Sequence, residues 1–384
     1  MRSSLPFRLA SIIGARPQFI KAAMVSKAIK SHNRAGGSTK IEEILIHTGQ
    51  HYDYNMSQVF FDQMKIPSPR YHLAVGSGTH NLMIGTMLIR IEKALMKENP
   101  DLVLVYGDTN STLAGALSAS KIPLPVAHVE AGLRSYNRGM PEEFNRLLTD
   151  HISSFLFCPT RAGVDNLRKE GLTDGVYEVG DVMYDAFLAY KDRAWKKSKI
   201  LADFDLSPGR FCLATVHREE NANHSERLKN IFRAFDELAD RGLPFIVPIH
   251  PRTREMIQKQ KMNMIKNPHV RLIAPVSYFD MLTLASHSRV ILTDSGGLQK
   301  EAFFARVPCI TLRNETEWIE TVETGMNRLS GTKAVSIIEN FHKVADARFR
   351  EYPNPATYYG DGNASRRILE TLIKSRHSAN KRRD

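Results

Sequence analysis

The sequence predicts an α/β protein built from two doubly wound domains. Its 384 residues are more than one ordinary hydrophobic core accommodates, so two domains are expected. Short apolar runs of strand length alternate with segments of helical period, a pattern typical of parallel sheets joined by crossover helices. The alternation occurs in two series, separated by a polar segment at 196–210 that contains Ser207-Pro208-Gly209 and that we expect to be a linker.

The first series predicts one doubly wound domain over residues 1–195. A strand at 8–13 runs into a turn at 14–17 and a helix at 18–31. The other expected strands are 43–47, 102–106, 126–129, 156–158 and 177–179, and the other main helices are 81–97, 111–120 and 184–195.

The second series predicts a similar domain over residues 196–362. Its expected strands are 211–216, 245–249, 270–273, 290–293 and 309–311. A turn-rich stretch at 352–362 leads into a last helix at about 363–375, so residues 363–384 are expected to return to the first domain and to end in a basic tail. Ligands of doubly wound sheets bind at the carboxyl ends of the strands, which favours a cleft between two facing domains.

Charge and hydropathy narrow the classes of function. The formal net charge of +12 is compatible with three kinds of negatively charged partner: nucleic acid, an anionic membrane or a phosphorylated small molecule. Basic residues cluster only in the tail, and no nucleic-acid-binding motif accompanies them, so we expect no nucleic-acid partner. The apolar runs are too short for a bilayer and the first residues lack the core of a signal peptide, which predicts a cytoplasmic protein without a membrane partner.

Three cysteines, Cys158, Cys212 and Cys309, lie in or beside apolar runs. None has CxxC or Cys/His spacing, so we expect reduced core residues.

Charged residues follow several strands of the first domain. Arg16 would begin a helix, where an arginine opposes the helix dipole unless an anion compensates it, which favours a phosphate contact over a surface position. Asp108 and Glu130 end neighbouring strands, and Glu142 begins a helix after Pro141. The three carboxylates are therefore expected to converge and to raise one another's pKa, although Glu142 alone fits an ordinary helix start.

In the second domain, residues 293–301, TDSGGLQKE, follow a strand and open a helix. Ser295, Gly296 and Gly297 would present N–H groups and a hydroxyl to a diphosphate, and Glu301 would reach a ribose. The segment lacks the Walker lysine and a full GxGxxG, so neither ATP hydrolysis nor NAD binding is expected. The alternative is a capped helix without a ligand.

Two histidines, His217 and His250, follow strands of the second domain. Neither has the companions of a zinc site, so no metal is expected. A histidine at a strand end is often structural, but a position at the cleft makes His217 a catalytic candidate.

The ordered motifs resemble those of one family, the non-hydrolysing UDP-N-acetylglucosamine 2-epimerases. They are GARPQFIK at Gly14, HTGQH at His47, YGDTNST at Tyr106, HVEAGLRS at His128, MPEEFNR at Met140, TVHREEN at Thr215 and TDSGGLQKEA at Thr293. The resemblance implies two Rossmann-like domains of the glycosyltransferase-B type facing across a cleft, a homodimer, and neither metal nor nicotinamide cofactor. It also implies elimination of UDP to a 2-acetamidoglycal and re-addition with inversion at C2, in the synthesis of surface polysaccharide precursors.

The motif positions imply the following site residues. The catalytic candidates are Asp108, Glu130, Glu142 and His217. The UDP-sugar-binding candidates are Arg16, Lys21, Ser295, Gly296, Gly297 and Glu301, with His250 and Arg313 expected near the phosphates.

Two departures bear on the substrate. Members activated by their own substrate carry a QHR-type stretch, whereas this chain has QHYD at residues 50–53, which puts such activation in doubt. The GARPQFIKA, TGQH and NMS segments also resemble a branch that acts on UDP-2,3-diacetamido-2,3-dideoxyglucuronate. The remaining alternatives are a hydrolysing epimerase, a glycosyltransferase and a protein that only binds UDP-sugars or polyanions.

Overall fold

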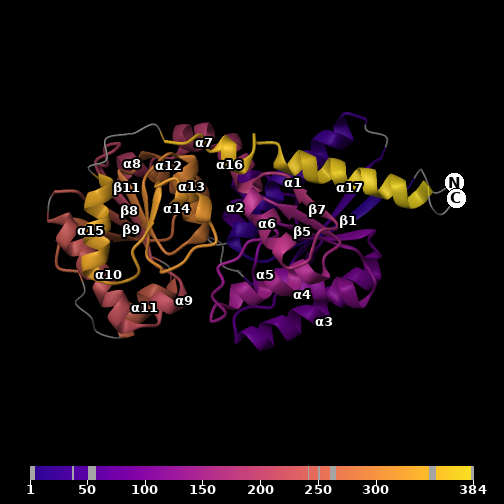
Figure 1. Cartoon of the computed structure of the whole chain (residues 1–384), viewed down its shortest axis with the longest axis horizontal. Coiled ribbons are helices and arrows are strands. Elements are labelled where there is room, and N and C mark those ends of the chain that lie inside the picture. The colour runs from indigo at the N-terminus through magenta and orange to yellow at the C-terminus, as the bar shows by residue number, and fades with distance from the viewer. Residues whose placement is uncertain are drawn as a thin grey trace. The chain divides into compact units, whose positions relative to one another are not determined.

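The computed structural model describes residues 5–36, 39–50, 58–240, 242–249, 251–259, 265–345 and 352–381. Its contacts divide the chain into two compact units. Unit 1 is formed by Met1–Leu188 with Ala356–Asp384, and unit 2 by Ala189–Pro355. The division falls within helix α7 (Val182–Lys197), and the last helix, α17 (Ala364–Lys381), belongs to unit 1 (Figure 1). No helix of the described residues is long and apolar enough to cross a membrane.

Unit 1 contains a seven-stranded sheet in the order β3-β2-β1-β4-β5-β6-β7, in which neighbouring strands are parallel. The strands are β1 (Phe7–Ile13), β2 (Ile41–His47), β3 (Tyr71–His72), β4 (Leu102–Tyr106), β5 (Val126–Val129), β6 (Phe155–Cys158) and β7 (Val176–Glu178). The strand order reverses between β1 and β4. Ligands of such sheets bind outside the carboxyl ends of the strands at this switch point.

Helices cover both faces of the unit 1 sheet. The group α3, α4 and α5 lies on one side, and α1 and α17 lie on the other (Figure 1). All five residues of β4 are buried, which explains its continuous apolar run. Besides α7 and α17, the helices are α1 (Arg16–Arg34), α2 (Gln58–Met64), α3 (His80–Glu98), α4 (Asn110–Lys121), α5 (Pro141–Ile152), α6 (Arg161–Lys169) and α16 (Ala356–Tyr359).

The start of α17 is fixed to α7 by one buried carboxylate. Asp185 accepts hydrogen bonds from the backbone N–H groups of Ala364, at 3.0 Å, and Ser365, at 2.8 Å, and from the Ser365 hydroxyl at 2.7 Å. These donors would otherwise remain unpaired in the first turn of a helix.

Unit 2 contains a six-stranded parallel sheet in the order β10-β9-β8-β11-β12-β13, with the switch point between β8 and β11. Separate apolar clusters fill its two faces, one against α10 and α15 and the other against α8, α12 and α13. The strands are β8 (Cys212–Thr215), β9 (Phe245–Pro248), β10 (Val270–Ile273), β11 (Val290–Thr293), β12 (Cys309–Thr311) and β13 (Asn327–Leu329). The helices are α8 (Ile200–Asp203), α9 (Glu219–Ala222), α10 (Ser225–Ala239), α11 (Pro251–Lys259), α12 (Tyr278–His287), α13 (Gly296–Phe304), α14 (Ile319–Glu323) and α15 (Ala334–Ala345).

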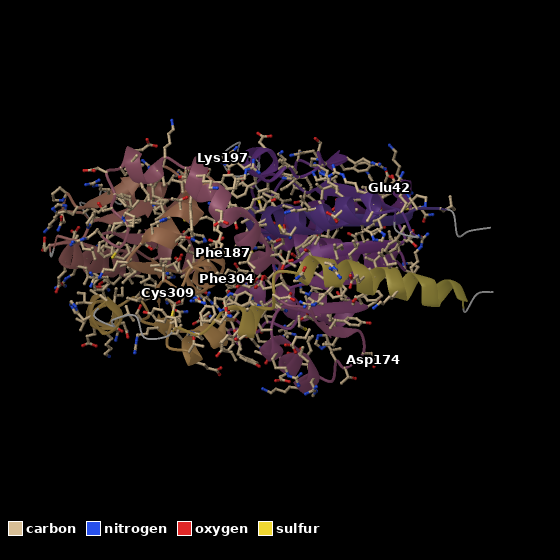
Figure 2. All side chains as sticks on the ribbon, turned by 90° about the horizontal axis from the view of Figure 1, so that it is seen from above. Glu42, Asp174, Phe187, Lys197, Phe304 and Cys309 are labelled. Carbon is tan, nitrogen blue, oxygen red and sulfur yellow. The ribbon has the colours of Figure 1, made fainter. Side chains whose placement is uncertain are left out.

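The predicted α/β class with two doubly wound parallel sheets is confirmed. The three cysteines are free and buried, as expected, and Cys309 lies on β12 (Figure 2). The prediction of a linker at 196–210 is wrong, because this segment contains α8 and buries Ile200 and Leu206 in the core of unit 2. Its many polar residues concealed these two apolar anchors.

Candidate active site

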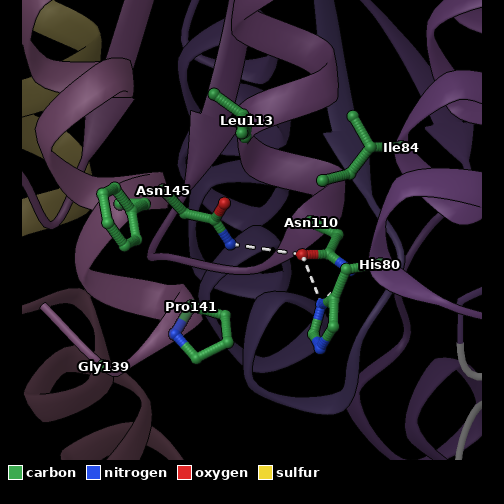
Figure 3. A pocket seen from close by; sticks show the side chains of 8 residues that line it. His80, Ile84, Asn110, Leu113, Gly139, Pro141 and Asn145 are labelled. Atoms are coloured by element: carbon green, nitrogen blue, oxygen red, sulfur yellow. Dashed lines mark hydrogen bonds between the residues drawn. The ribbon is translucent and has the colours of Figure 1, made fainter.

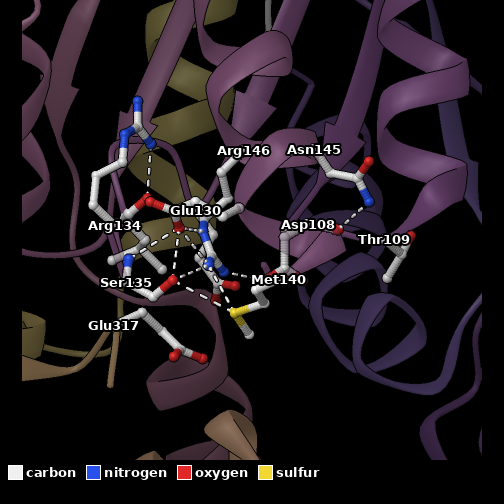
Figure 4. Close-up of polar contacts among 12 residues, drawn as sticks. Asp108, Thr109, Glu130, Arg134, Ser135, Met140, Asn145, Arg146 and Glu317 are labelled. Carbon is white, nitrogen blue, oxygen red and sulfur yellow. Dashed lines mark hydrogen bonds and ion pairs between the residues drawn. The ribbon is translucent and has the colours of Figure 1, made fainter. Parts of the chain in front are cut away.

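Asp108 lies directly beyond β4, at the switch point of unit 1. Its carboxylate accepts a hydrogen bond from Nη1 of Arg146 at 2.5 Å, and its backbone carbonyl accepts one from Asn145 Nδ2 at 2.8 Å (Figure 4). The preceding Gly107 has a φ of +65°, and a Cβ there would lie 2.9 Å from Nζ of Lys21. Glycine adopts this conformation without the cost that a side chain would add, and α5 holds the residue that follows it.

The guanidinium of Arg146 is held on its other side by Glu143. Both side chains are almost completely buried, and Nη2 of Arg146 lies 2.7 Å from the Glu143 carboxylate. Glu143 also accepts hydrogen bonds from the backbone N–H groups of Ser135 and Tyr136, each at 2.9 Å. The first turns of α5 therefore fix both the loop at 135–136 and the cation that faces Asp108.

The surroundings of Asp108 raise its pKa above the ordinary value of 3.8. Burial is the largest cause, and the charges of Glu142 and Glu130 act in the same direction, whereas Arg146 and Lys21 oppose them. The Asp108 side chain still exposes 28% of its surface. A partly accessible carboxylate with a raised pKa is suited to accept and return a proton near neutral pH.

Glu130 follows β5 and forms a salt bridge with Lys21 of α1. The distance from Nζ of Lys21 to the Glu130 carboxylate is 2.5 Å, and both side chains are at least 90% buried. Glu130 has a φ of 77°, which non-glycine residues adopt only at a cost in free energy. This conformation places a second carboxylate beside Gly107.

A buried network supports the loop that carries Asp108. Nε2 of His128 lies 2.7 Å from the Gly107 carbonyl oxygen, and Nδ1 lies 2.7 Å from Asp150. Asp150 also pairs with Arg134 at 2.7 Å. Because a carbonyl oxygen can only accept, His128 donates from Nε2 and holds the position of Gly107.

A cavity of about 290 Å³ lies next to this group. Its walls come from α3, α4 and α5, and the side chains of Asn145 and Asn110 form a hydrogen bond of 3.3 Å at its edge (Figure 3). Asn145 therefore contacts both this cavity and the backbone of Asp108.

In unit 2, the turn between β11 and α13 has two glycines with different surroundings. Ser295 is the N-cap of α13, and its hydroxyl accepts from the Leu298 N–H at 3.4 Å. A Cβ on Gly296 would collide with the Glu317 carboxylate, whereas a Cβ on Gly297 would meet only Ser295 Oγ, at 3.9 Å. Packing within unit 2 thus explains Gly296, while Gly297 leaves room for a ligand against the helix start.

Arginines surround Glu317 near this turn. Nη2 of Arg313 lies 3.0 Å from the Glu317 carboxylate and Nη2 of Arg218 lies 3.8 Å from it. Glu301 lies one turn into α13 and is buried. The start of α13 therefore combines helix N–H groups with guanidinium groups, which is an arrangement suited to an anion.

His217 lies just beyond β8, at the switch point of unit 2. Its Nδ1 is 3.2 Å from the carboxylate of Asp294, which follows the neighbouring strand β11. The His217 side chain exposes 40% of its surface, whereas Asp294 exposes none.

The structure brings the predicted residues together within each unit. In unit 1, the charges of Glu130, Glu142 and Lys21 act on Asp108, and Lys21 forms a salt bridge with Glu130. Arg16 begins α1 and lies over the ring of Phe60 at 5.2 Å. In unit 2, the candidates lie at or near the β8 and β11 ends and are His217, Ser295, Gly296, Gly297, Glu301 and Arg313. His250 and the segment 51–53 lie outside the described residues.

Sequence reasoning named Glu143 only as one of two carboxylates at the start of a helix, and it did not single out Arg146, Asp150 or Asp294. Arg146 stands three and four residues after Glu143 and Glu142, a spacing that places such side chains on one face of a helix. This spacing was the available signal for Arg146. Within the described part of the chain, no group of three or more His, Cys, Asp or Glu side chains is placed to hold a metal ion.

Fold and site together define a doubly wound α/β protein with acidic groups at one switch point and, at the other, a helix start with arginine side chains nearby. The family model for UDP-N-acetylglucosamine 2-epimerase matches residues 34–373. A Methanococcus maripaludis protein described as a homologue of that enzyme is 51% identical over 95% of this chain and 99% of its own length. The chain belongs to the UDP-N-acetylglucosamine 2-epimerase family, whose members are isomerases.

Two further relatives carry more detailed descriptions. The UDP-2,3-diacetamido-2,3-dideoxy-D-glucuronate 2-epimerase of Pseudomonas aeruginosa is 46% identical over 96% of this chain and 99% of its own length. The solved structure of the Methanocaldococcus jannaschii UDP-GlcNAc 2-epimerase, in complex with UDP-GlcNAc and UDP, has a TM-score of 0.88 and 43% identity. It covers 96% of this chain and 99% of that chain.

Proposed function

We propose that this protein is a non-hydrolysing UDP-sugar 2-epimerase that interconverts UDP-GlcNAc and UDP-ManNAc. The observation that carries the proposal is Asp108, a partly exposed carboxylate with a raised pKa that Arg146 holds at the switch point of unit 1. Removing a proton from a sugar carbon requires such a base, and the relatives supply the class of substrate.

The chemistry proceeds by elimination and re-addition. C2 of a 2-acetamido sugar is not adjacent to a carbonyl group, so loss of its proton must be coupled to departure of UDP from C1. The C2–H and C1–O bonds break, leaving a 2-acetamidoglycal and UDP. UDP then adds back to C1 while C2 receives a proton on the opposite face, which inverts C2 and leaves no net change in atoms.

Each candidate residue has a distinct role in this scheme. Asp108 or Glu130 removes the C2 proton, Glu142 delivers one to the opposite face, and His217 assists the departing phosphate. The start of α13 with Arg313 binds the diphosphate. Arg16 and His250 are proposed as further phosphate contacts, and Glu301 as a ribose contact.

A second substrate has a specific observation in its favour. The P. aeruginosa enzyme named for the diacetamido uronate is 46% identical to this chain, against 42% for the M. jannaschii UDP-GlcNAc 2-epimerase. UDP-2,3-diacetamido-2,3-dideoxyglucuronate is therefore the alternative substrate. Both share the C2 acetamido group on which the proposed chemistry acts.

Incubation of the protein with each sugar nucleotide in heavy water, followed by proton NMR, tests the proposal. We expect one of the two sugars to be converted to its C2 epimer with deuterium at C2 and without accumulation of free UDP. Net release of UDP and free sugar would indicate a hydrolysing epimerase, and sugar transfer that requires an acceptor would indicate a glycosyltransferase. Inertness of both sugars would refute the assignment.

We also propose a homodimer that acts in the cytoplasm and supplies surface polysaccharide precursors. Helix α3 exposes Leu82, Ile89 and Met96 at seven-residue intervals, by 65%, 58% and 69%. Two antiparallel copies of this stripe would pair Ile89 with Ile89 across a two-fold axis. In light scattering, the wild type and the control Leu272→Glu are expected to be dimers, and Ile89→Glu is expected to be a monomer. A monomeric wild type would contradict the proposed dimer.

A further inference from the structure

We propose that Asp294 is a positioning residue that fixes the tautomer and orientation of the His217 ring for the reaction. This inference rests on the proposed function for its kinetic consequence. The proton on Nδ1 of His217, by contrast, is inferred only from contacts within unit 2.

The sheet places the two residues side by side. β8 and β11 are parallel neighbours at the switch point, with Thr215 aligned with Thr293. The hydroxyl groups of these two threonines are 2.6 Å apart. Asp294 therefore begins the turn beside His217, and the register of the sheet determines their separation.

Asp294 is a completely buried carboxylate that accepts from several donors. The backbone N–H groups of His217 and Arg218 donate to it at 3.1 Å, as does Nδ2 of Asn221. Burial raises the pKa of Asp294, but the His217 ring and these donors outweigh it and leave the pKa below 3.8. The carboxylate is therefore ionised and can only accept.

The consequence for His217 follows from this ionisation. Because Asp294 can only accept, the nearby Nδ1 of His217, at 3.2 Å, carries a proton. In this tautomer Nε2 is the ring nitrogen that can accept a proton. When the ring is neutral, Nε2 accepts a proton, and when the ring is a cation, Nε2 donates a hydrogen bond to a phosphate oxygen. A residue that assists the departure of UDP needs both abilities.

The inference is tested on the intact protein by ¹⁵N NMR of the histidine rings at pH 8. The His217 signals are identified as those lost in His217→Gln. We expect wild-type Nδ1 to carry a proton and Nε2 to be unprotonated, and Asp294→Asn to weaken or reverse this preference. A wild-type ring protonated only on Nε2 would overturn the inference, and this result requires no catalytic turnover.

Kinetics provide the second readout. Asp294→Asn is expected to lower kcat by about 100-fold or more and to change its pH profile, with a much smaller effect on KM, because the ring is presented in the wrong tautomer. The matched control is Asp185→Asn, since Asp185 is also buried and accepts from backbone N–H groups and a side chain, but contacts no histidine. The control is expected to lose stability and keep the wild-type pH profile.

The outcomes separate the two proposals. If the wild type epimerises neither sugar, the proposed function fails, while the tautomer measurement still decides the inference. If Asp294→Asn folds and keeps both the wild-type tautomer and kcat, the inference fails while the proposed function stands.

Discussion

Replacing Arg146 by methionine removes the cation that lies between two acidic side chains of unit 1. Its guanidinium is 2.5 Å from Asp108 and 2.7 Å from Glu143, and its side chain is 1% exposed. Methionine has a similar length and no charge, so it fills most of the space of the arginine side chain. It removes the two ionic contacts and the weaker hydrogen bonds to Ser135 Oγ and Met140 Sδ. The variant therefore separates electrostatic effects from packing.

The expected magnitude follows from what each carboxylate retains. Removing one partner of a buried ion pair commonly costs about 3 to 5 kcal/mol. Glu143 keeps its hydrogen bonds from Ser135 and Tyr136, and Asp108 is 28% exposed and can gain water. We therefore expect a loss of about 3 kcal/mol in the free energy of unfolding, at the lower end of that range.

The effect on activity has a definite sign. Arg146 lowers the pKa of Asp108, which other causes raise, so its removal raises that pKa further. A protonated Asp108 cannot act as a base, hence the acidic limb of the profile of kcat/KM against pH moves to higher pH. At neutral pH, kcat/KM is expected to fall at least about tenfold, which corresponds to about 1.4 kcal/mol of barrier.

Epimerisation rates measured across pH by NMR, together with urea unfolding, test this reasoning. Arg146→Lys is the control that keeps the charge, and its acidic limb is expected to stay near that of the wild type. An Arg146→Met protein that is folded and keeps the wild-type acidic limb would refute the proposed dependence of Asp108 on Arg146.

Three further predictions concern single groups. The pKa of Asp108 is higher in the folded state than in the unfolded state, so its ionisation destabilises the wild type as pH rises above 3.8. The free energy of unfolding of Asp108→Asn, measured in urea, should therefore increase with pH relative to that of the wild type. A difference that stays constant with pH would contradict this. Gly296→Ala should lose about 1 to 3 kcal/mol of its free energy of unfolding, because the added methyl group collides with Glu317. Gly297→Ala should stay folded and bind UDP more weakly in calorimetry. Equal stability of the two variants would contradict the different roles given to the two glycines. Burial lowers the pKa of His47 to about 4. The stability that the neutral His47 ring contributes is therefore complete above pH 6.5 and is lost as pH falls toward 4. In thermal unfolding, His47→Gln should lose less stability than the wild type as pH falls.

The main strands of the fold could be predicted because both faces of each parallel sheet are buried. A strand in such a sheet is a short, continuous run of apolar residues. Strands β4, β10 and β11 were predicted with the bounds that the structure shows, and each is a short apolar run between polar segments. Strands β3 and β13 were missed, since two- and three-residue edge strands contain too little periodicity to detect. α8 was missed for a related reason, because only isolated apolar residues anchor it.

The candidate site could be predicted in part. Residues that directly follow strands, such as Asp108 and His217, can be found because the carboxyl ends of parallel strands meet at one edge of a sheet. Their partners Arg146 and Asp294 could not be assigned, because an ion pair depends on the packing of α5 and on the register of β8 with β11. The positive φ of Glu130 was likewise invisible in the sequence.

Exchange at C2 in the Asp108→Asn protein is the sharpest test of Asp108 as the base. The wild type and the variant are incubated with the sugar that the wild type converts, in heavy water at neutral pH, and the deuterium content at C2 is followed by NMR. We expect deuterium in the wild-type reaction and little or none with the variant, although the variant still binds UDP. Exchange at the wild-type rate in Asp108→Asn would contradict the assignment of Asp108 as the base and leave Glu130 as the candidate.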